Sequence, residues 1–452
     1  MKKSSGPRMP DSTTTPSIAE DDVGRKYAIM FPMSKLRQVK ALDWLRIGLL
    51  VAGVLAVPAG LLPRHDAIAV TLRILPLLAF LGSVIVLAEL TAGAGVFDVI
   101  ADRIAIFARG SYALLFLLCV AFAAVTTATL NLDTTAVLLT PVMLALAVRV
   151  GIAPVPLAMT TVWLANTASL LLPVSNLTNL LALNRVGMTP TAFAGRLWAV
   201  ELASVATTMA CLWIFYWRPK RRNADRYVPP TRYVPPSPAL FGIAAAACVG
   251  FIVAILYDVS LSIVSPVAAG VVILAYAVRA GGRKTPGAAP VRGSEERLVD
   301  LRLRGFLRAV LRILPWRLLV FVTGLFLVVE TVSLHGLSGV MATLIGHQNS
   351  VSGMYRAAAT GAGLSNAVNN LPAYVAGEAA VPRQNSDQLL ALLIGTNVGP
   401  IVTPWASLAN LLWYERCRSF QVTVPVRRFV GTGAVLAVAA LAVDVAVLAL
   451  TS

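Results

Sequence analysis

Runs of apolar residues, separated by short polar segments, recur along almost the whole chain. A run of about twenty apolar residues is long enough to cross the hydrocarbon core of a bilayer as an α-helix. The pattern therefore predicts an all-α polytopic membrane protein. We expect its spans at about 47–62, 74–93, 157–183, 197–217, 239–257, 261–278, 316–334, 387–413 and 429–450.

Two polar turns lie between shorter apolar arms. They are TLNLDTT (129–135) and SNAVNN (365–370). If both arms of each pair crossed the membrane, basic loops would fall on both sides, whereas Lys and Arg normally collect on the cytoplasmic side. We therefore expect two re-entrant helical hairpins, the first opening from the inside and the second from the outside. Their arms are predicted at about 112–128 and 136–149, and at about 354–366 and 371–380.

Composition and charge agree with this class. The chain is 57% hydrophobic, has a mean hydropathy of +0.76 and carries a net charge of +17. Although so basic a chain could bind nucleic acid, its basic residues lie in the loops between apolar spans, where they orient the helices. We expect no nucleic-acid partner and a multi-pass protein of the plasma membrane with a cytoplasmic N-terminus. An amphipathic segment, FDVIADRIAIFARG (97–110), is predicted to lie along the inner surface.

The loops divide the chain into four parts. We expect a basic, disordered cytoplasmic tail (1–43) and a first membrane repeat (44–218). A cytoplasmic linker (219–238) contains RYVPP twice, and proline makes such a linker stiff. The second membrane half (239–452) includes a basic cytoplasmic loop (280–314).

The chain contains an internal repeat. Residues 164–181 (LANTASLLLPVSNLTNLL) align with residues 395–412 (GTNVGPIVTPWASLANLL) at a constant offset of 231. Residues 80–95 align with residues 321–336 at an offset of 241. The halves begin on opposite sides of the membrane, so this is the inverted-topology repeat of secondary transporters. The matched pairs are Asn166–Asn397, Pro173–Pro404, Asn179–Asn410 and Glu89–Glu330.

Each of the two longer repeated segments is interrupted by a proline and contains several amides. Proline removes a backbone hydrogen bond and leaves carbonyl groups unpaired, which is costly in lipid unless protein, water or a solute satisfies them. Two interrupted helices and two hairpin tips meeting near the midplane would form one polar site. The alternative is that these amides only pack the spans together.

Carboxylates inside the predicted spans and turns are candidates for coupling. Asp133 lies at the first hairpin tip and is the strongest candidate for a proton or cation carrier, because intramembrane carboxylates tend to be functional. Its alternative role is to cap the arm that follows. We expect its counterpart in the second tip to be Asn369 or Asn370. Glu89 and Glu330 fit either a coupling role or an interfacial one.

Other chemistry finds little support in the sequence. The four cysteines show no CxxC spacing, so neither a disulfide framework nor a metal site is predicted. No GxxxxGK[ST] motif is present, so we expect no nucleotide hydrolysis, no other enzyme activity and no cofactor.

Four stretches carry a resemblance to a known family. LNLDTTAVLLTP (130–141), the interrupted segment 164–181, SNAVNNLPA (365–373) and GTNVGPIVTPWASLANLLW (395–413) are similar to the arsenite and antimonite efflux permeases of ArsB type. That family lies within an ion-transporter superfamily that includes sodium/proton antiporters and dicarboxylate carriers. The resemblance covers about residues 75–450. It implies export of arsenite or antimonite driven by the proton gradient, in some members with a cytoplasmic ATPase.

The resemblance also implies the site residues, since hairpin tips and interrupted helices form the site in that family. The matching solute-binding positions are Asn131, Thr134, Asn166, Ser169, Ser175 and Asn176, with Asn366, Asn369, Asn370, Asn397, Thr403 and Asn410. Coupling falls to Asp133, with Glu89 and Glu330 as further candidates. Many relatives have adjacent Asn and Asp residues at the first tip, whereas here Leu132 separates them.

The residue types favour a neutral solute. Arsenite is uncharged at neutral pH and resembles a small polyol, which amides and hydroxyls suit, whereas an anion carrier would show Arg or Lys at its site. None occurs in the four stretches. We therefore predict proton-coupled efflux of arsenite or antimonite by alternating access. A sodium/proton antiporter is the alternative, and a small-anion or dicarboxylate carrier and a non-transporting receptor are weaker ones.

The expected partners are the lipid bilayer, a small inorganic solute and protons. A cytoplasmic ATPase subunit and a second copy of the chain in a homodimer are further candidate partners. The sequence assigns no role to Asp444 in the last span.

Overall fold

The computed structural model describes residues 40–218, 227–257, 259–282, 313–346, 348 and 350–451. The predicted tail lies almost wholly outside these residues, as do 219–226 of the predicted linker and 283–312 of the predicted basic loop. The chain divides into two units, Met1–Arg46 and Ile47–Ser452, and everything that follows concerns the second.

All regular structure in the described residues is helical, and eight of these helical stretches are long and apolar enough to cross a membrane. This confirms the predicted all-α polytopic class. The elements in these eight stretches are α3 (Arg64–Gly93), α5 (Tyr112–Leu130), α6 (Leu132–Thr134) with η1 (Thr135–Leu139) and α7 (Thr140–Arg149), α10 (Pro190–Leu212) with η3 (Trp213–Trp217), α12 (Pro238–Leu256), α13 (Leu261–Gly282), α15 (Trp316–Val332) with η4 (Ser333–Leu337), and α21 (Val426–Leu450). A shorter apolar stretch, Ile47–Ala56 of helix α2 (Lys40–Ala56), precedes them in the second unit.

Local sequence signals explain where several of these helices begin. Ser111, Thr189 and Ser237 each accept a hydrogen bond from a backbone N–H in the first turn of α5, α10 and α12. Proline occupies the first turn of α10 and α12, where no backbone N–H is needed. Two boundaries differ clearly from the prediction. Helix α3 begins at Arg64, ten residues before the expected start, and contains Pro76. Helix α2 ends at Ala56, six residues before the expected end of the first span.

Both predicted pairs of arms form helical hairpins, although both arms of the first are long and apolar enough to cross a membrane. In the first, α5 and the continuous stretch α6–α7 meet at Asn131. In the second, α17 (Val351–Val368) and α18 (Asn370–Glu378) meet at Asn369. Nine residues of α-helix rise only about 13 Å, so α18 is too short to cross a bilayer.

The two predicted interrupted spans are confirmed as broken helices. The first consists of α8 (Pro154–Thr167), η2 (Pro173–Ser175) and α9 (Leu177–Val186). The second consists of α19 (Ser386–Val398), η5 (Gly399–Ile401) and α20 (Leu408–Ser419). Each therefore leaves the regular helix around the proline that the two segments share.

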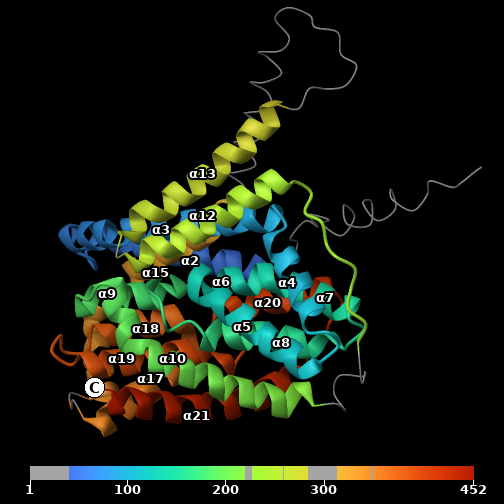
Figure 1. Ribbon diagram of the computed structural model, residues 1–452. Helices are drawn as coiled ribbons and strands as arrows, with labels where there is room; N and C mark the ends of the chain where they lie inside the picture. The colour runs from blue at the N-terminus through green and yellow to red at the C-terminus, as the bar shows by residue number, and fades with distance from the viewer. Residues whose placement is uncertain are drawn as a thin grey trace, which may run out of the picture. The chain divides into compact units, whose positions relative to one another are not determined.

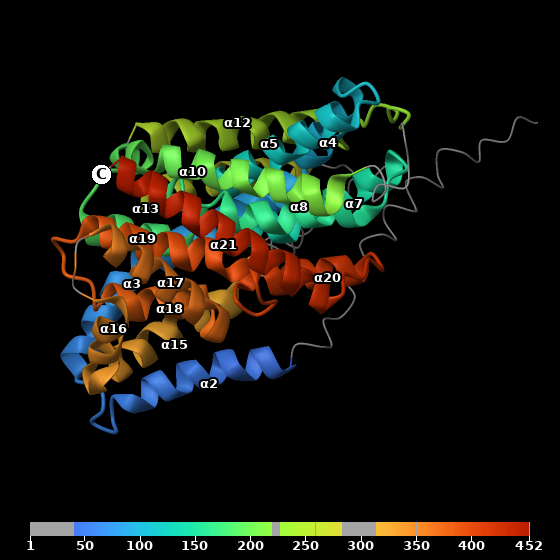
Figure 2. The same ribbon diagram turned by 90° about the horizontal axis from the view of Figure 1, so that it is seen from below.

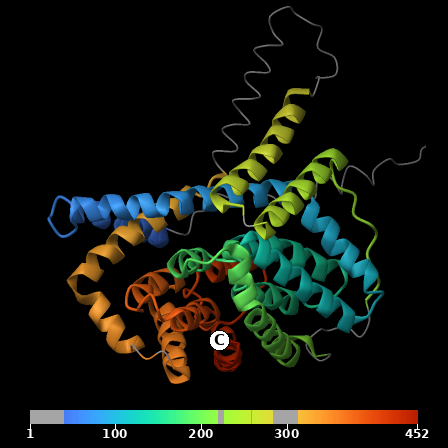
Figure 3. The ribbon, with the colours of Figure 1, turned by 60° about the vertical axis from the view of Figure 1, so that its left-hand side comes forward.

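The broken helices run antiparallel, since α8 packs against α20 and α9 packs against α19. In Figures 1 and 2, α7, α8 and α20 lie toward one end of the unit, whereas α19 and the C-terminus lie toward the other. Each hairpin packs against a broken helix: α5 contacts α8, and α17 contacts α19. Helices α10 and α21 pack against each other along their length. Figure 3 shows α12 and α13 beside α3, outside the broken helices.

Two further helices complete the described unit. The predicted inner-surface segment forms α4 (Val96–Phe107), and α16 (Ser338–Ile345) precedes the second hairpin.

Candidate functional site

The two hairpin tips share one backbone conformation. Asn131 has φ 92° and ψ 147°, and Asn369 has φ 110° and ψ 155°. Few residues other than glycine adopt positive φ, and such positions persist only where the surrounding structure enforces them. The Asn131 side chain accepts a hydrogen bond from Asp133 N at 2.9 Å, and the Asn369 side chain accepts one from Leu371 N at 3.4 Å. Each asparagine thus caps the arm that follows it.

This shared geometry corrects one expectation. Asn131 corresponds to Asn369, so Asp133 corresponds to Leu371 and not to Asn369 or Asn370 as expected from the sequence. The first tip thus carries a carboxylate where the second carries an apolar side chain. Leu132 stands between Asn131 and Asp133, so Asp133 lies one position further along the arm than it would if it followed Asn131 directly.

The broken helices are joined by a reciprocal pair of hydrogen bonds. Asn166 Nδ2 donates to Asn410 Oδ1 at 2.9 Å, and Asn397 Nδ2 donates to Asn179 Oδ1 at 2.7 Å. Asn166 and Asn397 are equivalent positions of the sequence repeat, as are Asn179 and Asn410, so the two bonds join equivalent pairs of residues. All four side chains are buried.

The same asparagines satisfy the unwound backbone. Asn179 Nδ2 donates to the carbonyls of Ser169 and Leu172, at 2.6 and 3.0 Å. Asn410 Nδ2 donates to the carbonyls of Pro400 and Thr403, at 2.7 and 3.1 Å. These acceptors lie 231 residues apart, so the match extends to the carbonyl groups that the breaks release. Unpaired, these groups would be costly at membrane depth.

The symmetry fails at one atom. Asn397 Oδ1 accepts hydrogen bonds from Asn176 Nδ2 at 3.0 Å and from Thr178 Oγ1 at 2.6 Å. The equivalent atom, Asn166 Oδ1, is buried without a hydrogen-bond partner. The residues equivalent to Asn176 and Thr178 are Ser407 and Ala409, which are too short or apolar to supply these donors.

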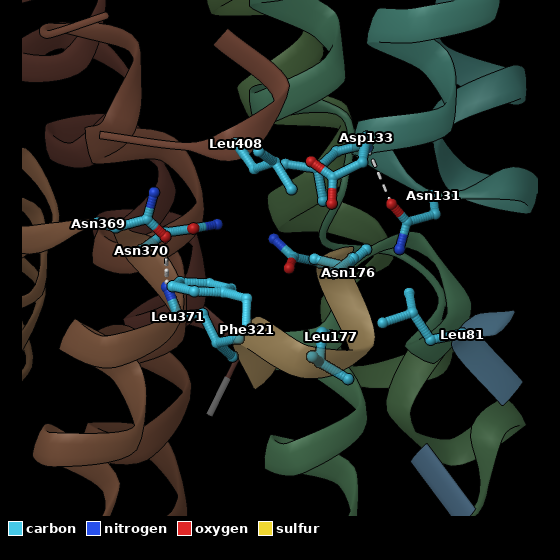
Figure 4. A pocket seen from close by; sticks show the side chains of 12 residues that line it. Leu81, Asn131, Asp133, Asn176, Leu177, Phe321, Asn369, Asn370, Leu371 and Leu408 are labelled. Atoms are coloured by element: carbon cyan, nitrogen blue, oxygen red, sulfur yellow. Dashed lines mark hydrogen bonds between the residues drawn. The ribbon is translucent and has the colours of Figure 1, made fainter. Parts of the chain in front are cut away.

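A cavity lies where the two tips meet the first broken helix (Figure 4). It encloses about 30 Å³, which is room for a water molecule or two. In Figure 4, Asn131 and Asp133 lie on one side, Asn369 and Asn370 on the other, and Asn176 between them. Its lining is Leu81, Asn131, Leu132, Asp133, Asn176, Leu177, Leu318, Phe321, Asn369, Asn370, Leu371 and Leu408.

Only some of the predicted site residues line this cavity. Those that do are Asn131, Asp133, Asn176, Asn369 and Asn370. Asn166, Asn397 and Asn410 instead form the interface between the broken helices, and Ser169 and Ser175 bond within the first break. Asn366 and Thr403 bond each other where the second hairpin meets the second break. The remaining three, Thr134, Glu89 and Glu330, do not line the cavity.

Sequence reasoning missed a buried carboxylate in α10. Glu201 is 5% exposed, and its Oε2 accepts a hydrogen bond from Leu170 N at 2.9 Å, inside the first break. The only available signal was a glutamate within an apolar span. A second missed group is the ion pair of Arg73 in α3 with the buried Glu378 at the end of α18.

The amphipathic segment differs in part from the prediction. It is a helix, but Asp102 is buried, accepts a hydrogen bond from Tyr233 N at 2.6 Å and pairs with Arg149 at 3.4 Å. The linker is therefore held against the base of the first hairpin. Burial raises the pKa of the neighbouring Asp98 carboxyl, although Arg149 opposes the shift.

Comparison with known proteins places this architecture among membrane transporters. Residues 41–388 match the family model described as citrate transporter. The chain is 28% identical over 398 residues to an arsenical pump membrane protein of Escherichia coli, covering 81% of this chain and 84% of that protein. A second E. coli protein of that name is 26% identical over 420 residues, covering 88% and 92%.

A solved structure, that of the YdaH transporter of Alcanivorax borkumensis, matches at 12% identity and a TM-score of 0.49, covering 91% of this chain and 97% of that one.

Proposed function

We propose that this chain, a member of the citrate transporter family and therefore a membrane transporter, exports arsenite or antimonite in exchange for protons. The observation that carries the proposal is the cavity between the hairpin tips, whose polar lining consists of four amides and one carboxylate. The relatives named arsenical pump membrane proteins, similar over more than four fifths of the chain, support this choice of solute.

The charges of the lining favour a neutral solute over the citrate in the family's name. Citrate carries several negative charges, and its recognition needs cationic groups or clustered backbone donors. Among the described residues that line the cavity, none is Lys, Arg or His, and Asp133 would repel a polyanion. Amides can donate to and accept from the hydroxyl groups of As(OH)₃ or Sb(OH)₃.

Transport by alternating access fits the arrangement of the repeats. The antiparallel broken helices and the two hairpins that enter from opposite ends support an inverted-topology repeat about an axis in the membrane plane. The cavity of about 30 Å³ is smaller than the solute, so binding requires the tips to separate. The paired asparagines would hold each broken helix intact while the tips move.

Asp133 is the proposed proton carrier at the cavity. Its main-chain N–H is held by Asn131, and its side chain faces Asn176 in the cavity (Figure 4). Binding of a proton by Asp133 and binding of the solute in the cavity would then exclude each other. Glu89 and Glu330, outside the cavity, would act through it only indirectly.

The proposed setting is the plasma membrane, with the N-terminus and the basic loops on the cytoplasmic side. The same proposal includes two further partners, a cytoplasmic ATPase subunit and a second copy of this chain in a homodimer.

Everted membrane vesicles test the proposal directly. When the vesicle lumen is more acidic than the medium, antimonite should accumulate in the lumen. Protons should leave the lumen in proportion to the antimonite taken up. Citrate and sodium, added in place of antimonite, should give no coupled proton movement. Sodium-dependent proton movement without antimonite uptake would instead establish the sodium/proton antiporter, which the single cavity carboxylate also favours.

A further inference from the structure

Helices α10 and α21 pack antiparallel in a constant register. Arg196 Nη1 donates to Thr451 O at 2.7 Å at one end, and Tyr216 Oη lies 2.8 Å from Thr432 Oγ1 at the other. The same register places Ser204 of α10 beside Asp444 of α21, with Glu201 about one turn before Ser204. Two carboxyl groups from different helices therefore share one buried region, remote from the cavity between the tips.

Asp444 lacks the partners that a buried carboxylate requires. Its side chain is 0% exposed, and neither of its oxygens has a hydrogen-bond partner. The hydroxyl of Ser204 beside it is also buried and without a bond. An ionised carboxylate in this place would lose its hydration without compensation, so it needs either a proton or a cation.

No described cation faces Asp444. The titratable groups on α10, α17 and α19, the helices packed on α21, are Arg196, Glu201, Cys211, Tyr355, Arg356 and Asp387. Arg356 donates to the carbonyls of Leu344 and Thr343. Arg196 lies about two turns from Ser204 and is bonded to Asp387 at 2.6 Å. Tyr355 donates its hydroxyl to Ala442 O at 2.8 Å. Among the described residues, the charged group that acts on Asp444 is another acid, Glu201.

Glu201 connects this acid pair to the first broken helix. Its Oε2 accepts from Leu170 N at 2.9 Å, so the carboxyl group caps a backbone donor that the break releases. A capping bond to a carboxylate is stronger than one to a neutral carboxylic acid. Protonation of the pair thus changes how firmly the break is held.

We infer that Asp444 and Glu201 form a proton-binding site, separate from Asp133, that couples proton exchange to movement of the first broken helix. The inference rests on the proposed proton-coupled transport. Uptake adds one proton to a carboxylate of the pair and gives a neutral carboxylic acid; release returns that proton to water and restores the carboxylate. Asp444 lies about 9 Å along α21 from its last residue, Leu450, which makes that end the shorter route to water.

Proton exchange by the purified full-length protein tests the inference. Antimonite is added to lightly buffered detergent solution, and the protons exchanged per bound antimonite are followed with a pH dye. Asp444→Asn and Glu201→Gln should each lower this ratio by half or more while retaining antimonite binding. Asp98→Asn, the same chemical change at the base of α4, is the control and should leave the ratio unchanged.

Several outcomes would overturn the inference. The inference is wrong if both folded variants exchange as many protons per bound antimonite as the wild type. It is also wrong if the pH change of the wild-type protein requires sodium. Should Asp444→Asn fail to fold, Glu201→Gln remains informative, because its amide oxygen can still accept from Leu170 N.

Infrared difference spectra separate this inference from the proposed function. The pair should show a protonated carboxyl band that titrates with pH and is lost in Asp444→Asn, whether or not antimonite is the solute. A wild-type protein that fails to bind antimonite but shows this band would contradict the proposed solute alone. Absence of the band would contradict the proton site.

Discussion

Asn166 and Asn410, 244 residues apart in the chain, share a buried hydrogen bond of 2.9 Å. Its counterpart across the repeat joins Asn397 to Asn179 at 2.7 Å. Each bond ends on an asparagine that also holds two carbonyls of its own broken helix. The breaks that a transporter needs are thus stabilised by the partner repeat.

Loss of one of these amides should destabilise the protein without altering the cavity. Asn410→Ala leaves two buried carbonyls without this donor and removes one of the two bonds of the Asn166 amide, which should cost about 2 kcal/mol of unfolding free energy. Thermal unfolding in detergent measures the loss. Asn179→Ala, at the equivalent position, should behave alike, and Asn385→Ala, outside the breaks, is the control. Equal melting temperatures for all three would contradict the role given to the pair.

The hairpin tips should tolerate glycine better than alanine. Asn131→Ala places a Cβ at positive φ without the side-chain cap and should cost roughly 1–3 kcal/mol, whereas Asn131→Gly accepts this backbone conformation. Asn369→Ala and Asn369→Gly repeat the comparison at the second tip. The measurement is again thermal unfolding in detergent. If Gly is no better than Ala at either tip, the strained turn is not what these asparagines stabilise.

Asp133→Asn should separate coupling from binding. The amide keeps the size and hydrogen-bonding capacity of the side chain but cannot exchange a proton at physiological pH. Accumulation of antimonite against its gradient should therefore fall at least tenfold, while exchange of antimonite at equal concentrations continues. Both rates are measured in proteoliposomes. Uphill transport at the wild-type rate would exclude Asp133 as the proton carrier.

Asp98 should make stability depend on pH. Burial raises its pKa in the folded protein above the value of 3.8 that it has when unfolded, so the folded state binds the proton more tightly. The contribution is fully present below that value and is lost as pH rises through the higher folded pKa. Melting temperatures between pH 3 and pH 8 should thus fall less steeply in Asp98→Asn than in the wild type. Asp98→Glu, which still titrates, should keep the slope.

The linear sequence by itself determined which segments form helices apolar enough to cross a membrane and where two segments break. Apolar length and proline act locally, so the broken helices and both hairpins could be predicted from the chain alone. The repeat offset of 231 also identified the equivalent asparagines. These features depend on what each residue does to its own backbone.

Only the tertiary structure decided which polar groups share a partner. Amides in an apolar segment must be satisfied, but Asn166 could bond across the repeat or line a cavity, and packing selects the first. Backbone conformation at the tips decided that Asp133 corresponds to Leu371. The register of α10 against α21 brings Glu201 and Asp444 into one buried region, because helix packing joins residues that lie far apart in the chain.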